Sequence, residues 1–177
     1  VLRIAALLHD VGRGEQDASG GRVCHAEQGA VLAEPLVKSL SIAPKKEENV
    51  LHCIRSHRFR SAHRPESIEA KVLFDADKLD TTGAIGVARG FVWIGRMNGE
   101  IENDVDLEEY IKQNHNGKTN GIIKNKTKHS VQIEFELKTK NLTKKLYTQK
   151  AKELCAERTE YFRNFLGRFE KEAKGEL

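Results

Sequence analysis

The chain has 177 residues, with 30 lysines and arginines against 26 acidic residues, a net charge of +4 and 38% hydrophobic residues. This length and composition predict one globular domain with its own core and exclude an intrinsically disordered chain. No apolar run reaches the roughly 18 residues that a membrane-spanning helix needs, and the start lacks the features of a signal peptide. The small positive excess does not indicate nucleic-acid binding.

Apolar residues at helical spacing dominate the first half of the chain. The Gly-rich stretch 11–23 is predicted to be a loop. Pro35 lies inside one of the predicted helices and is expected to kink it or to end its first half, whereas Pro44 suits the first position of a helix. In chain order, helices are predicted at residues 1–10, 25–40, 44–57, 67–81 and 85–94.

The second half of the chain is less regular. Residues 98–130 are polar and rich in turn formers, and we expect a mobile excursion there. The segment VQIEFEL at 131–137 alternates like a strand, yet Val131 and Phe135 also fit one face of a helix. Residues 143–172 carry amphipathic helical spacing. The fold class predicted from these patterns is all-α.

We therefore expect a single helical domain over residues 1–177. The helices that carry its site lie within 1–95, the polar excursion lies at about 98–130 and the C-terminal helices lie at about 131–173. The cysteines are odd in number and far apart, which fits neither a disulfide framework nor a CxxC metal site. They predict reduced thiols and a cytoplasmic location.

The histidines indicate where chemistry could take place. His9, His25 and His57 lie at or near predicted helix ends, and so does the acidic segment LFDADKLD. Helix ends that meet in space can gather ligands around one metal ion, as they do in helical bundles. The pair formed by His9 and Asp10 offers an imidazole nitrogen and a carboxylate oxygen, which suit Mn, Fe, Co, Ni, Zn or Mg. The alternative is a histidine favoured by the helix dipole beside an aspartate that ends the helix.

The chain closely resembles the HD superfamily of metal-dependent phosphohydrolases from residue 1 to about 94, and its C-terminal part resembles the tail of small bacterial members. The resemblance implies an HD-domain-like helical bundle. It also implies a divalent ion held by a histidine, a His-Asp pair and a distant aspartate. The segments that carry it are AALLHDVGR, HAEQGAVLAEPLV, VLHCIRSHRFR, LFDADKLDTTGAIGVAR and LYTQKAKELCAERTEYFRNFLGRFEKE.

The metal ligands implied by this resemblance can be placed on the sequence. His9 and Asp10 match the pair, and Asp77, directly before a lysine, matches the distant ligand, with Asp75 as the alternative. The first histidine of the signature would lie before His9, in sequence that is not present. Because the chain opens in the middle of an apolar helical pattern with no capping residue, we expect that an upstream helix is missing.

Two further histidines extend the implied site. In several HD branches additional histidines hold a second ion, which the aspartate of the His-Asp pair bridges, and the positions of His25 and His57 resemble those branches. The alternative is that these histidines contact a substrate phosphate or orient a ligand. The implied cofactor is thus one or two divalent metal ions.

Basic residues are implied to act on phosphate. The resemblance assigns catalytic roles to Asp10 and Lys78, because similar lysines reach the phosphates in nucleotide-cleaving relatives. Arg13 and Arg58 flank the expected site on loops, and Arg89 is placed to face the same cleft. Guanidinium groups clamp phosphate oxygens well. Each of these side chains could instead be exposed or ion-paired without a role in the site.

The function implied is metal-dependent hydrolysis of a phosphoester or phosphoanhydride of a nucleotide, of the nucleoside triphosphate pyrophosphohydrolase or nucleotidase type. The alternative is a non-catalytic HD module that binds a nucleotide or metal as a sensor. A nucleic-acid binder ranks last, because the charge excess is small and one tryptophan and three tyrosines offer little base stacking. The expected partner is a small nucleotide, with no membrane, and a homo-oligomer is left open.

Overall fold

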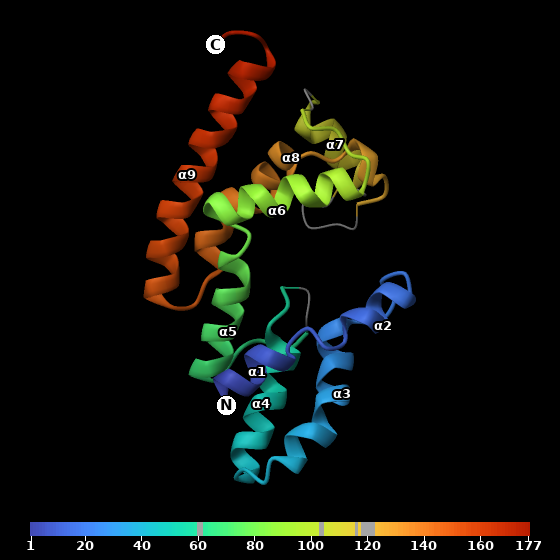
Figure 1. Cartoon of the computed structure of the whole chain (residues 1–177), viewed down its shortest axis with the longest axis vertical. Coiled ribbons are helices and arrows are strands. Elements are labelled where there is room, and N and C mark those ends of the chain that lie inside the picture. Colours follow the sequence, from blue (N-terminus) through green and yellow to red (C-terminus); the bar gives the residue numbers. More distant parts are fainter. Residues whose placement is uncertain (60–61, 103–104, 116, 118–122) are drawn as a thin grey trace. The chain divides into compact units, whose positions relative to one another are not determined.

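The computed structural model describes residues 1–59, 62–102, 105–115, 117 and 123–177. Throughout these residues the regular structure is helical, without a strand, which confirms the all-α fold class (Figure 1). The described residues form two compact units. Unit 1 comprises residues 1–77 with 146–148, and unit 2 comprises 78–145 with 149–177. Each unit is described by itself, and the single-domain organisation over 1–177 stays a prediction.

Unit 1 contains the first four helices predicted from the first half of the sequence. Its core is formed by apolar side chains of α1, α3, α4 and α5, among them Ala5, Val37, Ile54 and Leu73. One element differs from the prediction, because the expected Gly-rich loop contains the short helix α2. The bounds are α1 Leu2–Leu8, α2 Arg13–Ala18, α3 His25–Ser39, α4 Pro44–Ser56 and α5 Ile68–Leu79, the last of which extends past the end of the unit.

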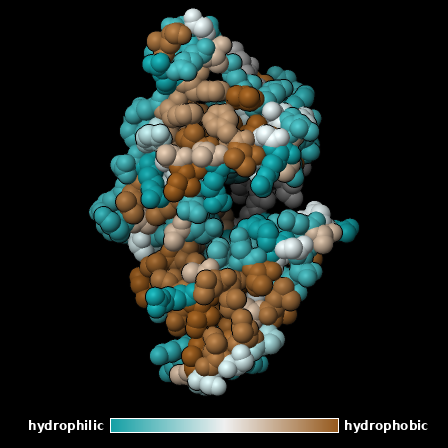
Figure 2. Space-filling model, in the orientation of Figure 1, coloured by the Kyte–Doolittle hydropathy of each residue, from teal (hydrophilic) through white to brown (hydrophobic). Residues whose placement is uncertain are grey.

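Helix α3 packs by its small residues rather than by its large ones. Its buried face presents Gly29, Ala30 and Ala33 at helical spacing, which allows a close approach to α4. The helix continues through Pro35 as one element. Four larger apolar side chains lie exposed along its other face, where apolar surface gathers in unit 1 (Figure 2): Val31, Leu32, Leu36 and Leu40. An apolar pattern alone therefore did not identify the buried face of this helix.

Asp75 of α5 holds the segment 146–148 in unit 1. Its two carboxylate oxygens accept hydrogen bonds from the backbone N–H groups of Tyr147 and Thr148 at 2.9 and 2.7 Å, and from the Thr148 hydroxyl at 2.7 Å. The ring of Tyr147 also packs edge-on against Phe74. Asp75 is 2% exposed, so water cannot replace these bonds.

We expect Asp75→Asn to lower the free energy of unfolding by about 2 kcal/mol, because the new amide group turns a donor toward a buried backbone N–H. Urea unfolding measures the change. The control is Asp80→Asn, since Asp80 lies just after α5 and its carboxylate is 55% exposed in an ion pair. A loss below about 0.5 kcal/mol, the range expected for exposed substitutions, would contradict the anchoring role of Asp75.

Unit 2 is built around the long helix α9. One core cluster of this unit joins Val87 and Ile94 of α6 to Phe162 and Leu166 of α9. The expected polar excursion contains helix α7 and a short 3-10 turn, while its residues 103–104, 116 and 118–122 lie outside the described residues. The bounds are α6 Gly83–Arg96, α7 Leu107–Asn114, η1 Lys126–Lys128, α8 Val131–Leu137, η2 Thr139–Lys145 and α9 Gln149–Ala173.

The ambiguous segment VQIEFEL is helix α8. The Ser130 hydroxyl caps it by accepting a hydrogen bond from a backbone N–H of its first turn. Val131 and Phe135 enter the core formed with α6 and α9, whereas Ile133 and Leu137 enter a second cluster that contains Tyr110 of α7. The strand-like alternation arises because this short helix is buried on two sides, each by a pair of residues four apart.

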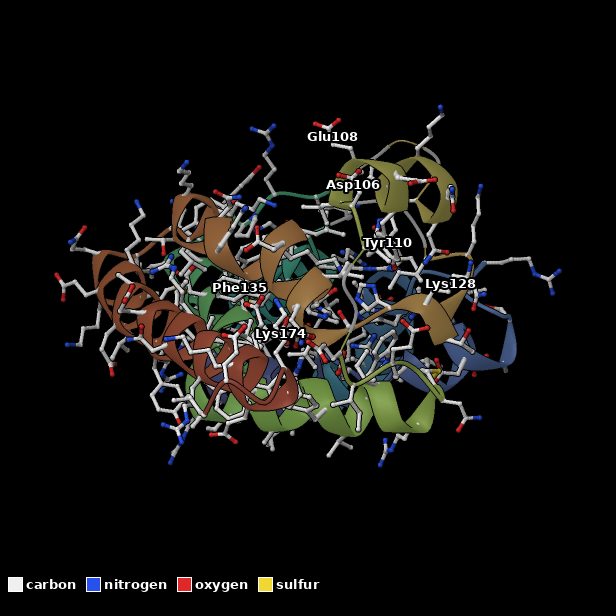
Figure 3. The ribbon with its side chains drawn as sticks, turned by 90° about the horizontal axis from the view of Figure 1, so that it is seen from above. Asp106, Glu108, Tyr110, Lys128, Phe135 and Lys174 are labelled. Atoms are coloured by element: carbon white, nitrogen blue, oxygen red, sulfur yellow. The ribbon has the colours of Figure 1, made fainter. Side chains whose placement is uncertain are left out.

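A buried chain of hydrogen bonds connects α7 to α8 in unit 2. The Tyr110 hydroxyl lies 2.6 Å from Nδ1 of His129, and Nε2 of that histidine lies 3.0 Å from the Glu134 carboxylate. Asn114 donates a hydrogen bond to the Tyr110 hydroxyl at 2.7 Å. Tyr110 lies on the helix that Asp106 caps (Figure 3). Burial favours a higher pKa of Glu134, but the bonds from His129 and Lys138 lower it to about 2.

This lowered pKa predicts an acid-dependent loss of stability. A carboxylate with a folded-state pKa near 2 stabilises the fold fully above its ordinary pKa of 4.5, and that contribution disappears as the pH falls toward 2. Because the Glu134 side chain is 40% exposed, we expect a contribution of about 1–2 kcal/mol. Glu134→Gln should lower the unfolding free energy by this amount at pH 7 and much less at pH 2.5, measured by urea unfolding. An equal loss at both pH values would contradict the assignment.

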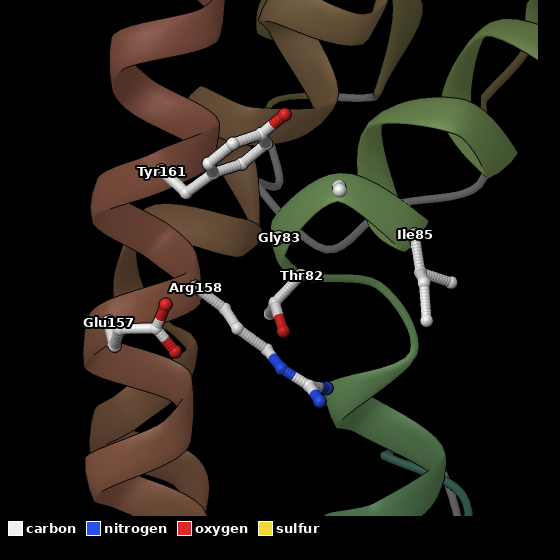
Figure 4. Close-up of a pocket in the computed structure, with 7 residues that line it drawn as sticks. Thr82, Gly83, Ile85, Glu157, Arg158 and Tyr161 are labelled. Carbon is white, nitrogen blue, oxygen red and sulfur yellow. The ribbon is translucent and has the colours of Figure 1, made fainter.

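A small pocket of about 270 Å³ lies in unit 2 beside the start of α6 (Figure 4). Gly83 adopts a φ of +64°, a conformation that favours glycine, and its missing side chain leaves room for the stem of Arg158. The guanidinium group of Arg158 donates a hydrogen bond to the Leu79 carbonyl. No predicted site residue lines this pocket, whose lining is Thr82, Gly83, Ala84, Ile85, Glu157, Arg158 and Tyr161.

Within the described ranges, no helix is both long enough and apolar enough to cross a membrane.

Candidate metal centre

Three helix ends of unit 1 meet at one point. His9 follows the last residue of α1 and is followed by Asp10, His25 is the first residue of α3, and His57 follows the last residue of α4. Helices α1 and α3 both pack on α4. A Cβ atom on Gly12 would lie 2.4 Å from the carbonyl oxygen of His25. The chain after α1 can therefore pass directly against the start of α3 only because residue 12 is glycine.

Asp10, His25 and His57 form a close polar cluster at this point. The Nε2 atoms of His25 and His57 lie 3.1 Å apart, and Oδ1 of Asp10 lies 3.5 and 3.7 Å from them. The two histidine side chains are 5% and 1% exposed, whereas the Asp10 carboxylate is 43% exposed. The cluster is thus buried on its histidine side and open on its carboxylate side.

The hydrogen bonds to Nδ1 determine which nitrogen of each ring faces the cluster. Nδ1 of His57 lies 2.7 Å from the carbonyl oxygen of Ile54, which can only accept, so the proton is on Nδ1. Nδ1 of His25 lies 2.8 Å from Oε1 of Gln16 and donates in the same way. With the proton on Nδ1, a neutral imidazole presents the lone pair of Nε2 to the cluster.

This donor set fits a divalent cation. Two nitrogen lone pairs and a carboxylate oxygen repel one another at such distances unless a positive charge lies between them. Burial, and then Arg13, lower the pKa of His25 to about 4, so its ring is neutral at pH 7. The pKa of Asp10 lies well below its usual range, so its carboxylate is ionised at pH 7. Neutral imidazoles and an ionised carboxylate are the forms that bind metal.

His9 lies beside this cluster. Its Nδ1 donates to the carbonyl oxygen of Ala6 at 2.8 Å, and its Nε2 lies 3.8 Å from Oδ2 of Asp10. Its ring meets that of His57 edge-on, with centroids 5.1 Å apart. Among the described residues, the group whose ligand atoms all lie within 4.8 Å of one another consists of Asp10, His25 and His57. His9 as a ligand stays a prediction.

The acidic segment of α5 supplies no side chain to this close group. Asp77 lies in the last turn of α5 and is half-buried. The carboxylate of Asp75, the alternative ligand, instead accepts hydrogen bonds from the backbone N–H groups of Tyr147 and Thr148. Asp77 as the distant ligand stays a prediction.

Two of the predicted arginines lie next to the cluster. Arg13 donates to both oxygens of Asp10, at 2.8 and 3.1 Å. Arg58 donates to the Cys24 thiol at 3.2 Å, directly before His25 in the chain. Positive charge is therefore available beside the cluster.

Lys78 and Arg89 belong to unit 2. Lys78 is 8% exposed, and the exposed Arg89 forms an ion pair of 3.1 Å with Asp80. The catalytic role of Lys78 and the substrate contacts of both side chains stay predictions.

Gln16 is the side chain that sequence reasoning missed. It contacts a candidate ligand from the predicted loop, and its hydrogen bond to His25 spans nine residues. No local pattern marks it, because a glutamine in a polar, Gly-rich stretch looks like any exposed residue. The contact exists because the short helix α2 brings the Gln16 side chain next to the start of α3.

Comparison with known proteins shows what this chain is similar to. The sequence pattern of the HD domain matches residues 1–82. An uncharacterised protein of Bacillus subtilis, YpgQ, is 28% identical over 138 residues, which is 76% of this chain and 56% of that protein. The chain thus spans just over half the length of that relative.

Solved structures share the fold. A predicted HD superfamily hydrolase from an uncultured Thermotogales bacterium is 26% identical, with a TM-score of 0.58 over 96% of this chain and 65% of its own. An HD-superfamily hydrolase from Bacillus thuringiensis is 24% identical, with a TM-score of 0.59 over 98% and 73%. YpgQ in complex with ADP is 23% identical, with a TM-score of 0.54 over 97% and 84%. The HD-domain match covers residues 1–82, which contain the His-Asp pair and the cluster described above, and the solved structures share the helical fold.

Proposed function

We propose that this chain is a metal-dependent phosphohydrolase that acts on a nucleotide. The observation that carries the proposal is the meeting of the Asp10 carboxylate with the two Nε2 lone pairs of His25 and His57 in one partly open cluster. Relatives with the same fold are described as HD-superfamily hydrolases. YpgQ has been crystallised with ADP, which makes nucleotides the first substrates to test.

The charge and burial of each side chain indicate its role in the proposed reaction. Asp10, His25 and His57 would hold the ion, and the open carboxylate side is where a substrate phosphate can approach. A divalent ion bound there lowers the pKa of water and offsets the negative charge of a phosphate group. Arg13 and Arg58 are placed to bind phosphate oxygens and to stabilise the charge that develops on them.

The test is a hydrolysis screen on the whole chain. The metal-stripped protein is loaded with Mn²⁺, Mg²⁺, Co²⁺ or Ni²⁺ and incubated with nucleoside mono-, di- and triphosphates, and released phosphate, pyrophosphate and nucleotide are quantified. We expect metal-dependent release that Asp10→Ala abolishes and Asp17→Ala, an exposed carboxylate of α2, leaves unchanged. Pyrophosphate as the product indicates a pyrophosphohydrolase, and phosphate indicates a nucleotidase. Nucleotide binding without turnover would overturn the proposal in favour of a sensor module.

A further inference from the structure

We infer that Gln16 is a positioning residue of this metal centre, which sets the orientation and the protonated nitrogen of His25. The inference rests on the proposed metal centre and deepens it. The amide Oε1 of Gln16 lies 2.8 Å from Nδ1 of His25 and 3.5 Å from the backbone nitrogen of the same residue. Because a backbone N–H only donates, the amide atom that faces both groups is the oxygen. Nδ1 therefore carries the proton and Nε2 keeps its lone pair.

His25 depends on a side chain for this bond because of where it lies in its helix. His9 and His57 follow the ends of α1 and α4, and their Nδ1 atoms donate to backbone carbonyls three residues earlier in the chain. Such carbonyls are present whatever the sequence. His25 is the first residue of α3, and the chain before it is not helical. Gln16 supplies from α2 the acceptor that the other two histidines obtain from their own helices.

Hydrogen bonds hold the backbone of α2 in a position from which the Gln16 side chain reaches His25. The N–H of Gln16 donates to the carbonyl of Gly12 at 3.3 Å, at the point where the chain passes against the start of α3. Its own carbonyl accepts from the Ser19 hydroxyl and from the N–H of Gly21, both at 2.8 Å. The Ser19 hydroxyl in turn accepts from the N–H of Val23 at 3.0 Å. The short helix is thus held at both ends, and the Gln16 side chain is half-buried between them.

The consequence concerns metal affinity. Without an acceptor at Nδ1, the neutral ring of His25 can place its proton on either nitrogen, and the form with the proton on Nε2 cannot bind the ion through Nε2, the atom that faces the cluster. Removal of the hydrogen-bond partner of a metal-bound histidine typically weakens metal binding by about 10–100-fold.

Two measurements on the full chain test the inference. Long-range ¹⁵N–¹H correlation spectra of the metal-free protein report which nitrogen of each histidine is protonated, and calorimetric titration with Mn²⁺ gives the affinity. Gln16→Leu should move His25 away from the Nδ1–H form, leave His9 and His57 unchanged and weaken Mn²⁺ binding by about 10–100-fold. Gln16→Glu, which keeps an acceptor, should keep the wild-type tautomer and stay within a few-fold of wild-type affinity. The control is Gln113→Leu on the exposed face of α7.

The outcomes separate this inference from the proposed function. If the wild-type chain binds no Mn²⁺, the metal centre fails, and the spectra still decide whether Gln16 fixes the tautomer of His25. If the wild-type chain binds Mn²⁺ and Gln16→Leu keeps both the Nδ1–H form and an unchanged affinity, the inference is overturned while the metal centre stands. Far-ultraviolet circular dichroism confirms that each variant is folded, and Gln16→Glu provides the comparison if Gln16→Leu is not.

Discussion

Asp10→Ala is expected to weaken Mn²⁺ binding on the order of 10³-fold or more and to abolish metal-dependent phosphate release. The carboxylate is the anionic member of the close group, and its removal leaves two imidazole nitrogens as the remaining ligands. A loss of this size corresponds to about 4 kcal/mol of binding free energy. Calorimetric titration with Mn²⁺ measures the affinity, and phosphate release on the preferred nucleotide measures the activity.

The controls for this change separate charge from position. Asp10→Asn keeps the shape of the side chain and removes its charge, so we expect it to lose most of the affinity too. Asp17→Ala removes an exposed carboxylate seven residues further along the chain and should leave the affinity unchanged. If Asp10→Ala and Asp17→Ala bind Mn²⁺ equally well, the ion binds elsewhere and Asp10 is not a ligand.

Gly12→Ala is expected to lower the free energy of unfolding by about 3 kcal/mol or more, as overpacking against rigid neighbours does. The new Cβ atom would lie 2.4 Å from the carbonyl oxygen of His25 and 2.6 Å from the backbone nitrogen of Gly29. Both atoms belong to backbone in the first turns of α3, so no side-chain rotation relieves the clash. The helix must shift, and His25 moves with it, so metal affinity should fall as well. Urea unfolding and Mn²⁺ titration measure the two effects.

The matched control lies two residues away. A Cβ atom on Gly14 would meet nothing within 4 Å, and Gly14 lies in α2. Gly14→Ala should therefore be neutral or stabilise the chain by up to about 1 kcal/mol through its higher helix propensity. Similar unfolding free energies for the two alanine variants would show that the chain after α1 does not pass against α3 as closely as the structure indicates.

Much of the fold could be predicted from the sequence, because helix ends carry local signals. Pro44 begins α4 as predicted, and His25 begins α3 directly after the Gly-rich stretch. The buried face of α3 could not be predicted from hydrophobicity, since its small residues pack inward while Leu32 and Leu36 stay exposed. Two helices that pack closely require small side chains at their contact rather than the most apolar ones. The hydrophobic pattern of α3 alone does not show that α4 packs against it.

The candidate site, too, could be predicted only in part from the sequence. His25 and His57 lie at helix ends, and the resemblance implied a second ion held by them and bridged by Asp10. The structure brings these three side chains together, and their binding of an ion stays a prediction. Gln16 could not be predicted, because its contact with His25 depends on a short helix in a stretch whose glycines indicated a loop. His129 could not be placed either, since its partners Tyr110 and Glu134 come from separate helices.

The most direct test of the metal centre is anomalous X-ray diffraction from crystals of the whole chain loaded with Mn²⁺. We expect one strong anomalous peak within bonding distance of Oδ1 of Asp10 and of Nε2 of both His25 and His57, with Nδ1 of His25 still bonded to Gln16. A peak that contacts none of these three atoms, or histidines that bind the ion through Nδ1, would contradict the metal centre described above.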